Sequence, residues 1–361
     1  MFKPTTDLHR HFDAQSAEAI KTVSMKHDLK FADKTIDEIR EITEVVPGSG
    51  FDKWYAAHTR AREAVFVKPE VFEDVAREAV KEAQVEGLET RILRFSLSMP
   101  MFCYKAKHGK RADLNDPKQR KEFLDLVDST IYHLAKGSNI APYEEGKVKT
   151  PLVFSLSYQD IFFDVMDDIA SVTLNHVDKI KGIDLCNEQF HRRAEDYKET
   201  IDKIREGGIT GLTMHVGEKW LNKDEQYDKS GRKNYSAVER INSGLKLNPN
   251  LLGHAIFAAV DQECMENISK SGAVIELCPS STMYSKDLNR EVLKGSYQNF
   301  PLKLYQSYKI PCTINTDVPD VVENTLAAEF ELMRDVFNLS DVELQDIDSV
   351  AKETAKRVYG A

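Results

Sequence analysis

Short apolar segments recur along the chain, and most are followed by a stretch whose apolar residues repeat at helical spacing. Strands that alternate with helices predict an α/β fold with parallel pairing through right-handed crossovers. The segments with strand character are Asp7 to Phe12, Thr90 to Leu97, Leu152 to Ser157, Ile180 to Cys186, Gly211 to Val216, Leu251 to Ile256, Ala273 to Cys278 and Pro311 to Thr316. Eight such segments favour closure into a (β/α)₈ TIM barrel over an open doubly wound sheet.

Three helices are well marked by their own residues. After Pro69, the apolar positions Val71, Val75, Ala79 and Ala83 recur every four residues. A second helix is predicted from Phe190 through Ile204, ending at Gly207 and Gly208. A third should begin at the capping box Ser340 to Glu343 and run to about Val358. With no internal repeat, low-complexity tract or Ser/Gly linker, residues 1–361 are predicted to form a single barrel domain.

Composition narrows the class of partner. The net charge of -10 excludes a broad cationic surface for nucleic acid or an anionic membrane, which leaves a small-molecule substrate. The sequence contains no apolar run of about 18 residues, so no membrane span is expected. The five cysteines are odd in number and never form a CxxC pair, which indicates a reducing compartment, by default the cytoplasm.

Candidate chemistry lies at the ends of four predicted strands. The first strand carries His9 and His11, two apart and therefore on one face. The fifth ends at His215, followed three residues later by Glu218; the sixth carries His254, and the eighth is followed by Asp317. Taken singly, each is also compatible with a chance pair, a structural histidine or a solvated carboxylate.

The combination points to a metal centre, because strand ends one, five, six and eight of a barrel face one pocket. Imidazole and carboxylate ligands suit zinc, with iron or manganese as alternatives, and leave a position open for water. A carboxylate such as that of Asp317 is costly to bury without a cation or hydrogen-bond donors around it.

The sequence resembles the adenosine deaminase family of the metal-dependent amidohydrolase superfamily over almost its whole length. The matching segments are Asp7 to Asp13, Leu93 to Ser96, Gly182 to Leu185, His215 to Glu218, Gly253 to His254, Glu276 to Ser281 and Asn315 to Asp317. The resemblance implies a hydrolytic deaminase of adenosine or a related aminopurine nucleoside or nucleotide. It implies one ion, preferably zinc, held by His9, His11, His215 and Asp317, which lowers the pKa of a water molecule toward 7.

The resemblance also assigns the proton carriers. Glu218 would protonate the purine ring, His254 would act as base or electrostatic partner of the water, and Asp317 would be catalytic as well as a ligand. Asp13 would contact the ribose, although it could equally be a helix cap or loop carboxylate. No lysine at the end of the fourth strand could bridge a second metal, which favours a single ion.

Two positions matched to purine recognition depart from the family. Val318 stands where the family has an aspartate that contacts the five-membered ring, and Asn187 stands where it has a glycine. Asp320 is a candidate to replace the missing carboxylate. Two alternatives therefore stay open: another substrate, such as a modified nucleotide, a non-purine aminoheterocycle or an amide, and a barrel that binds metal without turnover.

Overall fold

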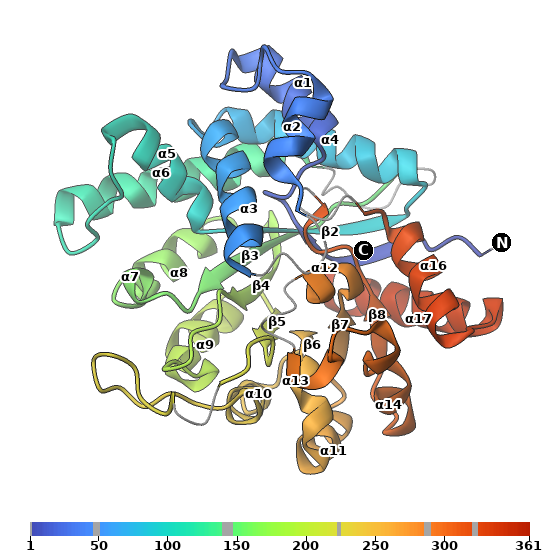
Figure 1. Ribbon diagram of the computed structural model, residues 1–361. Helices are drawn as coiled ribbons and strands as arrows, with labels where there is room; N and C mark the ends of the chain where they lie inside the picture. The colour runs from blue at the N-terminus through green and yellow to red at the C-terminus, as the bar shows by residue number, and fades with distance from the viewer. Residues whose placement is uncertain (1, 46–50, 139–146, 222–224, 285–289, 320–323) are drawn as a thin grey trace.

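The computed structural model describes residues 2–45, 51–138, 147–221, 225–284, 290–319 and 324–361. Its centre is one parallel sheet with strand order β1-β2-β3-β4-β5-β6-β7-β8, surrounded by helices (Figure 1). The strands are β1 Thr6–His11, β2 Thr90–Ser96, β3 Leu152–Ser157, β4 Ile180–Cys186, β5 Gly211–Val216, β6 Leu251–His254, β7 Val274–Leu277 and β8 Cys312–Ile314. The predicted (β/α)₈ barrel is confirmed.

The residues that close the sheet between β8 and β1 are themselves metal-site candidates. Just beyond β8, Asp317 pairs with β1: its N–H donates to the carbonyl of His9 at 2.8 Å, and the N–H of His11 donates to its carbonyl at 2.9 Å. The first and last strands are thereby joined at the end of the barrel where the site lies.

The connections between strands differ in length. Among the described residues between β1 and β2 lie the helices α1 Ala17–His27, α2 Ile36–Thr43, α3 Phe51–Val65 and α4 Val71–Glu86. The next connections hold α5 Ser98–His108, α6 Pro117–Gly137, α7 Asp160–Phe163, α8 Met166–Leu174, α9 Lys198–Glu206, α10 Ala237–Leu245 and α11 Gln262–Ser271. The last part of the chain holds α12 Pro279–Tyr284, α13 Arg290–Leu293, α14 Leu302–Ser307, α16 Leu326–Phe337 and α17 Asp341–Thr354.

The three expected helices are present, with one correction. The first is α4, and the third is α17, whose capping box of Ser340 and Glu343 is formed and which continues as a π-helical turn over Ala355–Tyr359. The second starts late, as a 3₁₀ turn over Ala194–Tyr197 that leads into α9. Its first residues are used otherwise, because the carbonyl of Phe190 accepts the N–H of Tyr235 at 2.7 Å.

The end of the barrel opposite the site is plugged by the C-terminus. Tyr359 packs beneath the strands in an apolar cluster with Leu8, Ile92 and Val153, and its hydroxyl lies 2.9 Å from that of Thr213. A Cβ at Gly182 would lie 2.8 Å from the Tyr359 ring, so glycine is required there. None of the described helices is long and apolar enough to cross a membrane.

Candidate active site

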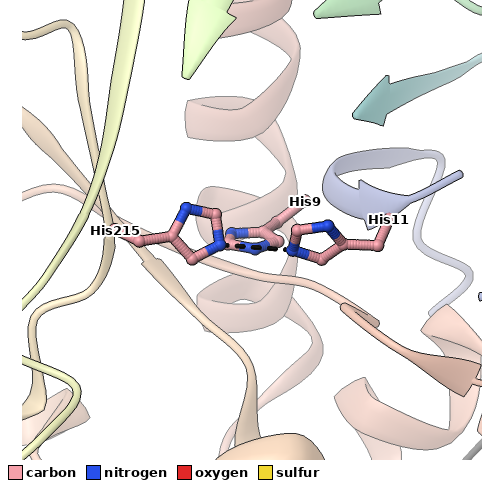
Figure 2. Close-up of side chains that lie close together, drawn as sticks. All are labelled: His9, His11 and His215. Carbon is pink, nitrogen blue, oxygen red and sulfur yellow. Dashed lines mark hydrogen bonds between the residues drawn. The ribbon is translucent and has the colours of Figure 1, made fainter. Parts of the chain in front are cut away.

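Three imidazoles meet at the carboxyl-terminal mouth of the barrel (Figure 2). His9 and His11 come from alternate positions of β1, and His215 comes from β5 across the barrel. The Nε2 atoms of His11 and His215 are 3.2 Å apart, and the ring centroids of His9 and His215 are 4.6 Å apart. One potential ligand atom from each ring lies within 4.8 Å of the others.

The fourth predicted ligand lies beside them. The Oδ1 atom of Asp317 is 3.4 Å from Nε2 of His11 and 3.6 Å from Nε2 of His9. Its other oxygen accepts a hydrogen bond from the Ser281 hydroxyl at 2.6 Å, which fixes the carboxylate plane. The structure therefore brings His9, His11, His215 and Asp317 into one cluster.

This cluster fits a divalent metal ion. Among the described residues, Nε2 of His9 is buried and has no hydrogen-bond partner, which is costly unless a ligand takes its lone pair. Burial lowers the pKa of both His9 and His11 well below the usual value, with further lowering from Arg94 and His215 respectively. Neutral imidazoles with an adjacent carboxylate are the donors that zinc and similar ions accept.

Buried carboxylates orient two of the three rings. Nδ1 of His215 is 3.0 Å from Asp184, whose second oxygen accepts from the Ser155 hydroxyl at 3.0 Å. Nδ1 of His9 is 3.2 Å from Glu276, which is itself paired with a buried arginine. A hydrogen bond donated by Nδ1 leaves the Nε2 lone pair free, so Asp184 holds the His215 ring in the form that binds metal. Nδ1 of His9 also lies 3.0 Å from Nη1 of Arg94, so this ring is positioned by both the carboxylate and the guanidinium.

A cavity of ≈ 240 Å³ opens directly over this cluster. The two predicted proton carriers, Glu218 and His254, line it beside His11, His215 and Asp317. Nε2 of His254 is 3.9 Å from Oδ2 of Asp317. Burial raises the pKa of Glu218, but electrostatic interactions with His254, Lys219 and other neighbours outweigh that effect and leave the pKa below its ordinary value.

The residues predicted to recognise the substrate divide into two groups. Asn187 and Val318 line the cavity, and Val318 is only 2% exposed. The Asn187 amide lies 3.4 Å from the Ser157 hydroxyl. Asp13 lies beyond the end of β1 and is absent from the cavity wall; its buried carboxylate pairs with Arg62 at 2.7 Å. Asp320 lies outside the described residues.

Sequence reasoning gave no individual role to several residues that support the site. Asp184 and Glu276 stood within matched segments, but only the strand register shows which histidine each contacts. Further cavity residues come from α3, namely Tyr55, His58 and Arg62. Their spacing of three and four residues places them on one helix face, but nothing in the sequence indicated that this helix lies at the barrel mouth.

The geometry agrees with comparisons to known proteins. Residues 4–357 match the family model described as adenosine deaminase. An adenosine deaminase of Clostridium perfringens is 24% identical over 339 residues, 93% of this chain and 89% of the relative. The solved adenine deaminase of Arthrobacter aurescens has a TM-score of 0.74 at 15% identity, covering 98% of this chain and 93% of that one. The solved N6-methyl-AMP deaminase of Arabidopsis thaliana has a TM-score of 0.69 at 17% identity, covering 98% of this chain and 91% of that one. The chain belongs to the adenosine deaminase family.

Proposed function

We propose that this protein is a hydrolytic deaminase of an aminopurine compound and uses one divalent metal ion. The observation that carries the proposal is the placement of Glu218 and His254 on the wall of the same cavity whose floor holds His11, His215 and Asp317. A set of metal ligands alone would suit many kinds of hydrolase. Two groups that can transfer protons, placed beside the same cavity, are what the deamination of a small heterocycle requires in addition.

The metal would be held by His9, His11, His215 and Asp317, and zinc is the ion we propose because its usual ligands are imidazole and carboxylate. Iron and manganese are the alternatives for the same ligand set. When bound, such an ion makes water a nucleophile near neutral pH by lowering its pKa. A single ion is proposed because Asp184, on β4, is already committed to His215.

The protein's own side chains then handle the protons. Water adds to the ring carbon that bears the amino group, forming a C–O bond, and gives one proton to His254. The Glu218 carboxyl, protonated once the bound substrate excludes water from it, passes its proton to the neighbouring ring nitrogen. His254 then passes its proton to the amino group, which allows the C–N bond to break, and the remaining hydroxyl proton returns to Glu218. The products are the oxo-purine and ammonia or, from an N-substituted amine, the corresponding free amine. The cavity encloses the reaction between α3 and the strand ends.

A second candidate keeps this chemistry but changes the substrate to a modified nucleotide, a non-purine aminoheterocycle or an amide. It is favoured by Val318 and Asn187, which line the cavity and stand at positions that the resemblance matches to purine recognition. Valine offers no hydrogen bond, so a ring nitrogen placed against it would be desolvated without a partner, at a cost of about 1–3 kcal/mol. We also propose that residues 1–361 form one domain and act in the cytoplasm.

The test is turnover by zinc-loaded protein on adenine, adenosine, AMP and N6-methyl-AMP, followed by chromatography of the oxo-product and by released amine. Aminopyrimidines and pterins extend the panel to the second candidate. Elemental analysis should find one tightly bound ion per chain. A metal-loaded protein that turns over no aminopurine would overturn the proposed function, and activity on the other heterocycles alone would establish the second candidate. Inertness toward every compound would indicate a metal-binding barrel without catalysis.

A further inference from the structure

The loop that carries Glu218 is held by one buried carboxylate, that of Glu188. Glu188 lies just beyond β4 and is 2% exposed. One of its oxygens accepts the backbone N–H of Gly217 at 2.9 Å, and the other accepts the N–H groups of Glu218 and Lys219, both at 3.3 Å. Three successive N–H groups therefore converge on a single carboxylate around the proton carrier.

Gly217 makes this convergence possible. Its φ of +64° lies in the left-handed region, and a Cβ there would sit 2.4 Å from Cδ1 of Ile241. A left-handed residue at a strand end turns the following peptides so that successive N–H groups point to one side, an arrangement that binds anions. Here the anion is supplied by the chain itself.

Arg240, on α10, completes the arrangement from the other side. It is 2% exposed, and its Nε donates to Glu188 at 2.7 Å. Its remaining nitrogens donate to the carbonyls of Tyr235 and Lys219, the latter at 2.5 Å. The peptides on both sides of Glu218 are thus fixed by one buried ion pair.

Stability alone does not account for this ion pair. A buried salt bridge pays a desolvation cost that its attraction often only balances, and apolar replacements of such pairs are frequently neutral or stabilising. The Glu218 carboxylate, moreover, forms no hydrogen bond or ion pair with any described residue. Its reach toward a substrate therefore starts from a backbone that the Glu188–Arg240 ion pair holds in place.

We propose that Glu188 is a positioning residue for the reaction: together with Arg240 it fixes residues 217–219 so that the Glu218 carboxyl meets the substrate ring. This inference rests on the proposed function of Glu218 as proton carrier. A displacement of about 1 Å in a reacting group can cost about 10²-fold in rate, so even a small shift of this loop should be measurable.

The test is Glu188→Gln, which keeps the size of the side chain and one acceptor oxygen but turns an NH₂ group toward backbone donors. With whichever of adenine, adenosine and N6-methyl-AMP the natural protein converts fastest, we expect kcat to fall about 10–100-fold. KM and metal content should stay close to those of the natural protein. Glu206→Gln, at the exposed end of α9, is the matched control and should leave all three unchanged.

A double-mutant cycle separates positioning from a purely structural role. If Glu188 acts through Glu218, adding Glu188→Gln to Glu218→Gln should lower the remaining rate by less than about threefold. The same loss in both backgrounds, or an unchanged kcat in the single variant, would overturn the proposal. Should Glu188→Gln fail to fold, Arg240→Lys serves the same cycle, because it removes the contacts to the carbonyls while keeping the buried charge. A natural protein without turnover would instead overturn the proposed function.

Discussion

Replacing Asp184 by asparagine should weaken metal binding without unfolding the protein. The carboxylate is fully buried, 3.0 Å from Nδ1 of His215 and 3.0 Å from the Ser155 hydroxyl. Asparagine keeps an acceptor for the imidazole N–H, and its NH₂ can donate to the serine oxygen once the serine hydroxyl rotates away. What is lost is the negative charge that makes the opposite ring nitrogen a better ligand.

The expected size of the effect follows from that loss. Removing such a supporting contact to a ligating histidine typically lowers metal affinity about 10–100-fold, which is about 1.4–2.8 kcal/mol of binding free energy. Competition for zinc against a chromophoric chelator at fixed pH measures this directly. Asp178→Asn, an exposed change just before the same strand, is the matched control. The free energy of unfolding of the metal-free protein should change by much less than the binding free energy.

If Asp184→Asn binds zinc as tightly as the natural protein while its metal-free form unfolds more easily, the carboxylate serves packing and hydrogen bonding rather than the ligand. The ring of His215 would then be oriented by its place on β5 alone.

Three other perturbations have signs set by the structure. Gly253→Ala would place a Cβ 3.1 Å from the His9 ring, so metal retention and kcat should both fall about tenfold or more, and unchanged metal content would contradict this. Val318→Asp should raise adenosine turnover relative to the protein's best substrate, and a fall with metal retained would favour a different ligand pose. Burial raises the pKa of Glu329 to about 7, so its stabilising contribution is complete below the unfolded value of 4.5 and is lost as the pH rises to about 7. Glutamine does not titrate, so the free energy of unfolding of Glu329→Gln minus that of the natural protein should rise by up to roughly 3 kcal/mol from pH 5 to pH 8. Urea titrations at the two pH values that show no such rise would exclude this ionisation.

The strands were predictable because burial on both faces leaves near-continuous apolar runs. Their ends were less so. The sixth strand was expected to reach Ile256 but stops at His254, and the eighth was expected to reach Thr316 but stops at Ile314. His254 has a φ of 60° and Ala255 a φ of 47°, and such left-handed residues leave the ladder. Glycine is the strongest sequence signal for this conformation, and neither residue is glycine.

The metal-site candidates were predictable for a different reason than their supporting contacts. His9 and His11 lie on one strand, so their shared direction follows from local alternation. The contact of Glu276 with His9 joins residues 267 positions apart, and that of Glu188 with Arg240 joins residues 52 apart. Such pairs depend on strand register and loop path, which no local pattern encodes. The sequence therefore predicted the candidate metal ligands but not the contacts that orient them.

The left-handed residues also bear on the departure from the family that the resemblance predicts at Asn187. They follow four strands that build the cavity: Asn187 after β4, Gly217 after β5, His254 at the end of β6 and Asp317 after β8, with φ between 60° and 64°. Asparagine is among the non-glycine residues best tolerated in this region, so Asn187 can adopt the turn at which the resemblance predicts a glycine. The replacement adds an amide to the cavity wall and leaves the neighbouring peptides in place. Backbone strain of about 1–3 kcal/mol per residue persists only where the surroundings enforce it. The packing of the barrel therefore holds these strand ends, and the site residues on them, in position. Asn187 and Val318 line the cavity without belonging to the proposed ligand set, so changes at these two positions can alter the cavity wall while the four proposed metal ligands stay the same.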